Sequence, residues 1–364
     1  MIVFDNIIFS LQKSGGVSVV WHEMLERIIG STDVEKLYLE YDDASNNIFR
    51  KQLQIPQNDI VIRKRNKLFA WERYQNVRLS FLQNPFIFHS SYYRTTTNKN
   101  AINITTVHDF TYEYYSDGIK QKIHCRQKYA AIRKSDIIIC VSENTKRDLL
   151  KFLPEIKENK VHVIHNGVSE DYFPITNDLI HDFQLPFPKQ SYLLFVGSRT
   201  AYKRFDFAVD IARKFQFNLI IVGGEKLSDI ENKLLESKLS KNSYTHIRGA
   251  SNEQLNYLYN NAFCLIYPSE YEGFGIPVLE AQKAGCPVIA YNGSSIPEIA
   301  GETTLLFNNF DMEEISSKID LLKENTQRKE IIDKGIENVQ RFSWDKTYST
   351  LLAIYHEALI KTHK

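Results

Sequence analysis

Short runs of apolar residues alternate along the chain with longer amphipathic segments. The apolar runs predict buried strands and the longer segments predict helices. In the first half, the predicted strands are 2–4, 36–39, 86–89, 102–107, 137–141 and 161–164, and the predicted helices are 17–29, 120–133 and 143–152. In the second half, the strands are 192–196, 218–222, 246–248, 264–267 and 288–291, and the helices are 205–214, 227–239, 252–260 and 277–284. This alternation favours parallel sheets that are covered by helices on both faces.

Residues 171–190 separate the two series of elements and contain three prolines, which is typical of a linker. With 364 residues, the chain is too long for one ordinary core. We therefore expect an α/β protein of two Rossmann-like doubly wound domains, residues 1–175 and 190–341, that face each other across a cleft. Ligands of such domains bind at the carboxyl ends of the strands. Residues 313–364 are predicted to be almost entirely helical.

Composition narrows the class of protein further. Hydrophobic residues make up 43% of the chain, and the net charge is +1, so no overall field would attract nucleic acid. The four cysteines are widely spaced without a C-x-x-C pair, which favours a reducing compartment. The N-terminus lacks the features of a signal peptide, and no apolar stretch approaches the roughly 20 residues needed to cross a bilayer. We expect a soluble, cytoplasmic protein.

The segment EGFGIPVLE, from Glu272 to Glu280, is the most informative part of the chain. Its two carboxylates flank a predicted junction between a loop and a short helix. Gly273 and Gly275 allow a sharp turn there, and Pro277 suits the first helical position. The N-terminus of such a helix carries free N–H groups and a partial positive charge, which suit a phosphate. A sugar nucleotide, with hydroxyls at both ends and a diphosphate between them, fits this arrangement.

A second cluster follows the predicted strand 192–196. Gly197 comes directly after it, and Arg199 and Lys203 lie in the loop and first turn that lead to the next helix. Fixed cations at this place would neutralise the charge that grows on a departing nucleoside diphosphate, and would so stabilise the transition state. The alternative is a solvated basic turn.

Two features of the N-terminal half also lie at predicted strand ends. Gly15 and Gly16 precede a helix, and their backbone would approach a phosphate or an acceptor; the alternative is a turn in which Ser14 caps the helix. His108 would meet substrate at its strand end, with Asp109 beside it to orient the ring or raise its basicity. The alternative is a histidine that is hydrogen-bonded to backbone in a turn.

Several motifs are absent from the sequence. There is no D-x-D, which would suggest a metal-bound diphosphate, and there are no clustered zinc ligands. The glycines at 273 and 275 lack the third glycine of a nicotinamide site. The basic run 63–67, followed by Phe69, Trp71 and Arg73, is interpreted as a solvated surface, with contact to an anionic membrane face as the alternative.

The run YPSEYEGFGIPVLEA at 267–281, together with 284–289 and 294–298, closely resembles the retaining GT-B glycosyltransferases of family GT4, glycosyl transferases group 1. The family signature of two glutamates separated by seven residues is matched by Glu272 and Glu280. The resemblance covers nearly all of residues 190–345 and extends more loosely over the N-terminal half. Residues 4–18 look like bacterial enzymes of O-antigen and capsule assembly, which work on lipid-linked glycans at the cytoplasmic face of the membrane.

The resemblance implies how the second domain would bind the donor. Glu272 would contact hydroxyls of the donor sugar, near the backbone of Gly273, Phe274 and Gly275. Glu280 would hold the ribose. Arg199 and Lys203, which follow Gly197, would neutralise the diphosphate and help it to leave.

The resemblance also implies roles for the first domain. His108 would border the reacting centre, and Gly16 would lie near the diphosphate and the acceptor, next to Gly15 in the acceptor-binding loop. The first domain would select the acceptor, and residues 342–364 would form a helix that crosses back to it.

We therefore expect a metal-independent, retaining hexosyltransferase (EC 2.4) without a cofactor. Its partners would be a nucleoside diphosphate sugar and a glycan acceptor, such as a lipid-linked O-antigen or capsule oligosaccharide, with peripheral contact at the inner membrane as an added expectation. The alternatives are a sugar-nucleotide epimerase of the same fold and a protein that binds a sugar nucleotide without turnover. A phosphorylase would need a lysine for pyridoxal phosphate, for which the sequence has no motif.

Overall fold

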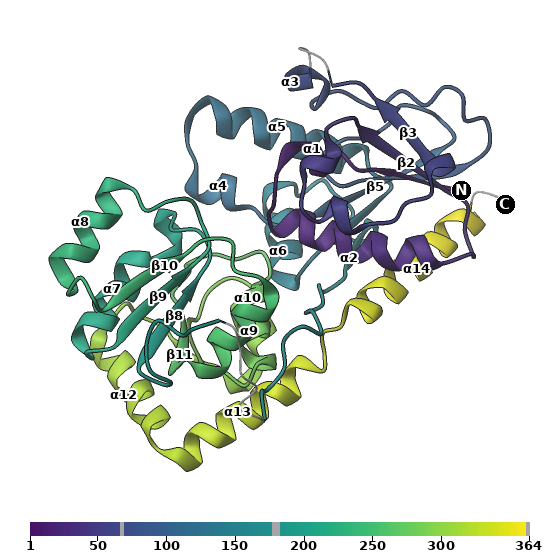
Figure 1. Ribbon diagram of the computed structural model, residues 1–364. Coiled ribbons are helices and arrows are strands. Elements are labelled where there is room, and N and C mark those ends of the chain that lie inside the picture. Colours follow the sequence, from purple (N-terminus) through teal and green to yellow (C-terminus); the bar gives the residue numbers. More distant parts are fainter. Residues whose placement is uncertain (66–68, 177–182, 362–364) are drawn as a thin grey trace. The chain divides into compact units, whose positions relative to one another are not determined.

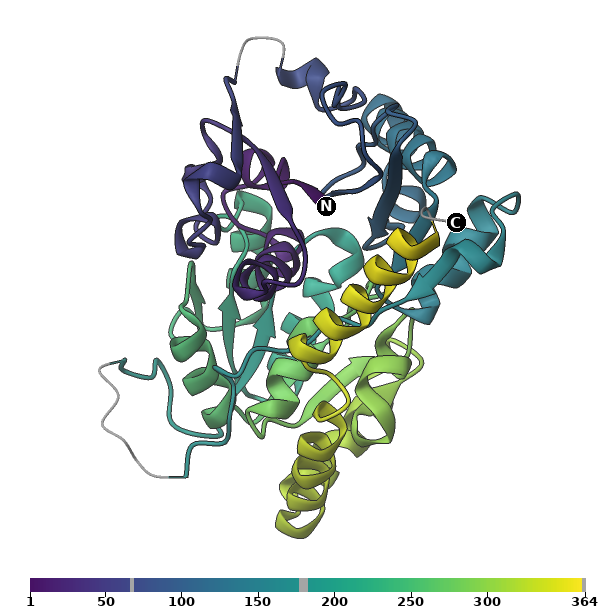
Figure 2. The same ribbon diagram turned by 90° about the vertical axis from the view of Figure 1, so that its right-hand side faces the viewer.

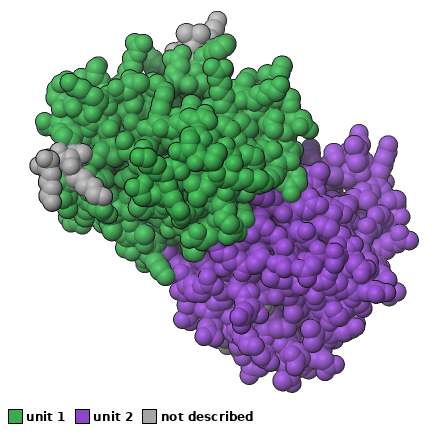
Figure 3. Space-filling model, turned by 180° about the vertical axis from the view of Figure 1, so that it is seen from behind, with its two compact units in different colours: residues 1–167, 344–364 green, residues 168–343 purple. Residues whose placement is uncertain are grey.

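The structure of the protein is a computed structural model that describes residues 1–65, 69–176 and 183–361. The chain divides into two compact units, coloured separately in Figure 3. Unit 1 contains Met1–Gly167 and Trp344–Lys364, and unit 2 contains Val168–Ser343. The cleft expected between the two units stays a prediction.

The described part of unit 1 holds a sheet of seven parallel strands in the order β3-β2-β1-β4-β5-β6-β7 (Figure 1). The strands are β1 (Ile2–Asp5), β2 (Lys36–Tyr41), β3 (Ile60–Arg63), β4 (Phe86–Ser90), β5 (Ala101–Val107), β6 (Ile137–Cys140) and β7 (Val161–Val163). The helices are α1 (Ile8–Leu11), α2 (Gly16–Gly30), α3 (Phe69–Glu72), α4 (Thr111–Tyr115), α5 (Gly118–Lys134), α6 (Glu143–Phe152) and α14 (Trp344–Lys361).

The described part of unit 2 holds a six-stranded parallel sheet in the order β10-β9-β8-β11-β12-β13. Its strands are β8 (Tyr192–Val196), β9 (Asn218–Val222), β10 (Tyr244–Ile247), β11 (Cys264–Tyr267), β12 (Val288–Tyr291) and β13 (Leu305–Phe307). Its helices are α7 (Phe205–Lys214), α8 (Asp229–Lys238), α9 (Asn252–Asn261), α10 (Ile276–Lys283), α11 (Ile296–Ala300), α12 (Met312–Lys323) and α13 (Asn325–Val339). The prediction of two doubly wound α/β domains with parallel sheets is confirmed.

The C-terminal helix α14, yellow in Figures 1 and 2, packs on unit 1. Leu351 and Tyr355 of α14 are buried in the same cluster as Phe4 of β1 and Trp21 of α2. The Tyr355 hydroxyl also contacts the ring of His89 on β4, at 2.5 Å from Nδ1. The last helix of the chain therefore completes the core of the first unit.

The boundary of unit 1 differs from the predicted residue 175, because the segment after Gly167 is fixed to helix α9 of unit 2. Three asparagines at successive turns of α9 accept hydrogen bonds from this segment. Asn252 Oδ1 accepts from the Tyr172 hydroxyl at 3.3 Å, and Asn256 and Asn260 accept from the backbone N–H groups of Phe173 and Ile175 at 3.1 and 2.7 Å. Residues 177–182 of the predicted linker lie outside the described residues.

Candidate functional site

Lys203 and Glu272 form the centre of the candidate site in unit 2. Lys203 ends a short 3-10 turn after β8, and Glu272 lies in the loop between the neighbouring strand β11 and helix α10. Lys203 Nζ donates a hydrogen bond to Glu272 Oε1, and only 14% and 12% of these side chains are exposed. The carboxyl ends of adjacent parallel strands meet at one edge of the sheet. The sequence-predicted cation and carboxylate are therefore brought together there.

The loop that carries Glu272 is held by two serines that follow β12. Ser294 Oγ accepts a hydrogen bond from the Glu272 N–H at 2.8 Å. The Ser295 hydroxyl donates to the carbonyls of Glu272 and Phe274 at 2.9 and 2.8 Å. These serines therefore position the backbone that presents Glu272.

The start of helix α10 needs a glycine at one of the two predicted positions. Gly275 has φ 108°, and a Cβ there would lie 2.7 Å from Ile296 Cδ1. Gly273 does not have a positive φ, so the expectation that both glycines make the sharp turn with a left-handed backbone is wrong. Helix α10 begins at Ile276, which places Pro277 one residue further into the first turn than predicted. The free N–H groups expected at this helix start remain in the first turn.

Glu280 lies half-buried on α10 and accepts a hydrogen bond at Oε2 from the Tyr259 hydroxyl at 3.1 Å. Burial raises the pKa of Glu280 to about 7, and hydrogen bonds from Tyr259 and Tyr172 act in the opposite direction. Since the largest effect is desolvation, the charged form is disfavoured unless a ligand replaces the lost water contacts. A ligand with hydroxyl donors would do so.

Arg199 has a different environment from the one predicted. Its Nε pairs with Glu231 Oε1 at 2.7 Å, and its Nη1 and Nη2 donate to the carbonyls of Gly223 and Glu225 at 3.0 and 2.5 Å. Only 4% of the Arg199 side chain is exposed. Arg199 therefore ties the loop after β8 to the loop between β9 and α8, rather than joining Lys203 and Glu272.

Glu231 was missed by the sequence reasoning. It closes a capping box at the start of α8, where Ser228 Oγ accepts from the Glu231 N–H and Glu231 Oε2 accepts from the Ser228 N–H. The Ser-x-x-Glu spacing signals the cap. It gives no sign of the bond to Arg199, because that contact depends on how two strand-end loops meet.

In unit 1, His108 follows β5 and lines a small cavity of about 40 Å³. Its apolar wall includes Trp21, Met24 and Leu351. Asn166, which follows β7, also lines it. Burial lowers the pKa of His108 to about 4, although the charge of Asp109 acts to raise it. Asp109 was expected to make the ring more basic, but burial lowers the pKa by more than the charge of Asp109 raises it. Asp109 Oδ1 instead accepts from the Thr111 N–H at 2.9 Å.

The glycine pair before α2 is only partly as predicted. Gly15 is the N-cap of α2, without a side-chain cap, so Ser14 does not take that role. A Cβ at Gly15 would lie 2.2 Å from Gln12 Oε1, whereas one at Gly16 would meet nothing within 4 Å. The backbone at Gly16 is therefore open to approach.

The basic run of unit 1 is partly paired. Arg65 forms an ion pair with Asp43, and its guanidinium lies 4.2 Å from the centre of the Phe69 ring. Trp71 is 71% exposed. Lys67 lies outside the described residues.

The described residues contain no group of three or more His, Cys, Asp or Glu side chains that could hold a metal ion. Their four cysteines are free. A search of the described helices finds none that is both long and apolar enough to span a membrane.

Comparison with known proteins assigns the family. The profile described as Glycosyltransferase Family 4 matches residues 14–172, and the profile described as Glycosyl transferases group 1 matches residues 177–355. The chain belongs to the GT4 family of glycosyltransferases.

Two curated relatives of this glycosyltransferase are named for O-antigen chains. O-antigen chain mannosyltransferase B of Escherichia coli is 24% identical over 267 residues, which are 69% of each chain. The O-antigen chain mannosyltransferase RfbU of Salmonella typhimurium is 28% identical over 245 residues, 66% of this chain and 65% of RfbU. The chain thus spans about two thirds of the length of these relatives.

Solved structures share the GT-B fold. Sucrose-phosphate synthase from Thermosynechococcus elongatus has a TM-score of 0.76 at 17% identity, over 99% of both chains. Anabaena HepE, in complex with UDP and glucose, has a TM-score of 0.72 at 14% identity, over 97% of this chain and 98% of HepE. At such identities the likeness concerns the fold alone.

Proposed function

We propose that this glycosyltransferase moves a hexose from a nucleoside diphosphate sugar to a glycan acceptor, with retention at the anomeric carbon and without a metal ion. The observation that carries the proposal is the contact of Lys203 Nζ with Glu272 Oε1 just before the N-terminus of α10. A cation, a carboxylate and free helix N–H groups at one sheet edge offer partners for a diphosphate and for sugar hydroxyls.

Each side chain of unit 2 has a distinct part in binding the donor. Glu272 accepts hydrogen bonds from hydroxyls of the donor sugar, near the backbone of Phe274, and Lys203 pairs with the diphosphate. Glu280 accepts from the ribose hydroxyls, which replace the water that burial removes. Arg199, whose charge is paired with Glu231, fixes the loop that carries Lys203.

The chemical step exchanges one bond for another at the anomeric carbon. The bond from this carbon to the diphosphate oxygen breaks, and a bond to the acceptor oxygen forms on the same face. The acceptor proton passes to the departing phosphate oxygen. Lys203 stabilises the charge that develops on the diphosphate. His108 is neutral near pH 7 because burial lowers its pKa, so it would act as a hydrogen-bonding group and not as a charge.

Mannose is the first hexose to test, because the relatives in Escherichia coli and Salmonella typhimurium are named as mannosyltransferases. The same names favour an O-antigen chain as the acceptor, and the family resemblance adds a lipid-linked or capsule oligosaccharide. A lipid-linked acceptor would bring the protein to the cytoplasmic membrane face, where the exposed Trp71 is suited to peripheral contact.

The test is a product analysis with GDP-mannose, UDP-glucose and dTDP-glucose, each with a lipid-linked oligosaccharide acceptor. The proposal predicts a new glycoside whose anomeric configuration, read by NMR, matches that of the donor. Formation of an epimerised sugar nucleotide would support an epimerase instead. Tight donor binding without product would support a protein that only binds sugar nucleotides.

A further inference from the structure

A larger polar cavity lies elsewhere in unit 1. We define the α5 cavity as the space of about 400 Å³ lined by Tyr74, Asn76, Arg78, Arg94, Gln127 and Lys134, together with neighbouring residues. This volume falls in the range of ordinary ligand pockets, about 300–1,000 Å³. The α5 cavity shares no lining residue with the cavity at His108.

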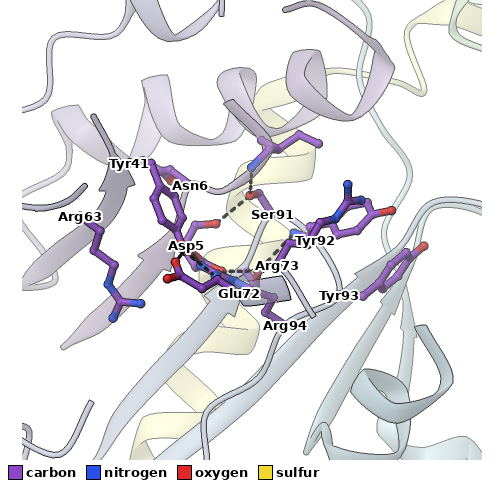
Figure 4. Close-up of polar contacts among 12 residues, drawn as sticks. Asp5, Asn6, Tyr41, Arg63, Glu72, Arg73, Ser91, Tyr92, Tyr93 and Arg94 are labelled. Carbon is purple, nitrogen blue, oxygen red and sulfur yellow. Dashed lines mark hydrogen bonds and ion pairs between the residues drawn. The ribbon is translucent and has the colours of Figure 1, made fainter. Parts of the chain in front are cut away.

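The lining of the α5 cavity is cationic. Among the described residues that line it, none is acidic and three are basic. Arg94 is buried and forms an ion pair with Asp5, as Figure 4 shows, so it fixes the wall without adding net charge. Arg78 and Lys134 are exposed, and among the described residues neither side chain is paired with a carboxylate. The cavity therefore presents two uncompensated positive charges.

Polar side chains between the cations are fixed in place. Gln127 is 8% exposed, and its Nε2 donates to the carbonyls of Arg73 and Tyr93 at 2.7 and 3.1 Å. Its Oε1 is buried and accepts no hydrogen bond from the described residues. Asn76 Oδ1 accepts from Thr95 Oγ1 at 2.9 Å and from Lys134 Nζ at 3.3 Å. A buried acceptor without a partner favours a ligand that brings a donor.

An aromatic ring completes the lining. Tyr74 is 42% exposed, and the guanidinium of Arg73 lies 5.1 Å from the centre of its ring. An exposed ring beside amide, hydroxyl and cationic groups suits a ligand that has apolar ring faces, hydroxyls and negative charge.

We propose that the α5 cavity binds an acidic saccharide, a sugar that carries a carboxylate or phosphate group. Arg78 and Lys134 pair with the anion, Asn76 and Gln127 bond hydroxyls, and Tyr74 covers a ring face. No bond is made or broken there. The cavity holds part of a glycan apart from the transfer reaction, and its occupancy does not depend on the donor.

Calorimetric titration of the full chain with a hyaluronan tetrasaccharide and with trigalacturonate tests this proposal. We expect one of these acids to bind, with an affinity that falls as salt is added. The double variant Arg78→Ala/Lys134→Ala should bind at least about tenfold more weakly, since both charge-assisted contacts are lost. The matched control Lys120→Ala/Lys122→Ala removes two exposed cations from the other half of α5 and should bind as the unchanged protein does.

Three results would overturn the proposal: no binding of either acid, equal binding of neutral chitotetraose, or unaltered binding by the Arg78→Ala/Lys134→Ala variant. Inorganic phosphate that binds as tightly as the saccharides would also overturn it, because the site would then be a simple anion site. The variant Glu272→Ala should keep full saccharide binding. This outcome separates the α5 cavity from the proposed donor site.

Discussion

The hydroxyl of Tyr259 donates a hydrogen bond to Glu280 Oε2 at 3.1 Å. Tyr259 is fully buried on α9, and Glu280 is half-buried on α10. Because burial raises the pKa of Glu280 to about 7, the proposed ribose-binding carboxylate changes charge near neutral pH. The tyrosine favours the charged form and so sets part of that balance.

Donor affinity should therefore depend on pH. Below about pH 7, Glu280 takes up a proton and becomes a poorer acceptor, so we expect weaker nucleotide binding there. The substitution Tyr259→Phe removes a hydrogen bond to the carboxylate and should move this acidic limb to higher pH. Titration of the protein with GDP and with UDP between roughly pH 5.5 and 8.5 measures how nucleotide affinity depends on pH. Tyr192→Phe is the control, because the Tyr192 hydroxyl donates to the Leu258 carbonyl and not to Glu280. If the affinity of Tyr259→Phe depended on pH as that of the unchanged protein does, the proposed role of Tyr259 would be contradicted.

The same carboxylate should affect stability. The pKa of Glu280 rises from 4.5 to about 7 on folding, so the folded state binds more protons between these values. Its contribution to stability is fully present below pH 4.5 and is lost as the pH rises through about 7. Glutamine does not titrate, so the stability of Glu280→Gln relative to the unchanged protein should rise between pH 4.5 and about 7. Above about pH 7 this difference in stability should stay constant. Thermal unfolding across the interval checks this, and a margin independent of pH would argue against it.

A glycine comparison tests the predicted close approach of backbone to ligand. A Cβ at Gly16 has open space around it, so Gly16→Ala should leave the melting temperature unchanged. If a phosphate or acceptor approaches this backbone, the methyl group should still lower kcat/KM by about tenfold, or about 1.4 kcal/mol. Gly275→Ala should instead lower both stability and activity, because φ is 108° and Ile296 lies in the way. Full activity of Gly16→Ala would remove Gly16 from the site.

Arg199 and Glu231 should behave as one unit. Removal of either partner leaves a largely buried charge unpaired, so Arg199→Ala should cost about 3 kcal/mol of unfolding free energy. A double-mutant cycle with Glu231→Gln should give a coupling of about 1 kcal/mol or more. Chemical denaturation of the four proteins gives the coupling, and simple additivity would show that the contact has no energetic role.

Activity should be insensitive to chelators. We expect EDTA to leave the rate of transfer unchanged, since Lys203 and the start of α10 supply the positive charge that a metal would otherwise bring. Loss of activity that added Mg²⁺ or Mn²⁺ restores would contradict the proposed metal independence.

The sequence predicts the central strands well, but among the four edge strands that the structure describes it finds only Val161–Val163 closely. Tyr192–Val196 and Cys264–Tyr267 are found as predicted, because central parallel strands are continuous apolar runs. Ile60–Arg63 and Leu305–Phe307 were missed, since both lie at sheet edges, are short and keep partly exposed side chains. The strand expected at 246–248 is Tyr244–Ile247, which is polar and half-buried at the edge next to β9.

Some features of the candidate site could be predicted from the sequence, and others depend on tertiary packing. The pairing of Lys203 with Glu272 could be expected, because both follow strands that are central in the fold. The partners of Arg199 could not, because two of them are backbone carbonyls of the segment after β9 and the third, Glu231, lies in the first turn of α8. The pKa values of His108 and Glu280 depend on burial, which only the packed structure reveals.

The contact of Lys203 with Glu272 is the basis of the proposed function, and donor-dependent turnover of the two alanine variants tests it most directly. Each of Lys203→Ala and Glu272→Ala should lower turnover at least about a hundredfold. Lys238→Ala, which breaks the ion pair with Asp210 on α7, should retain normal turnover. Near-normal rates for both site variants, in proteins that fold as the unchanged chain does, would contradict the account.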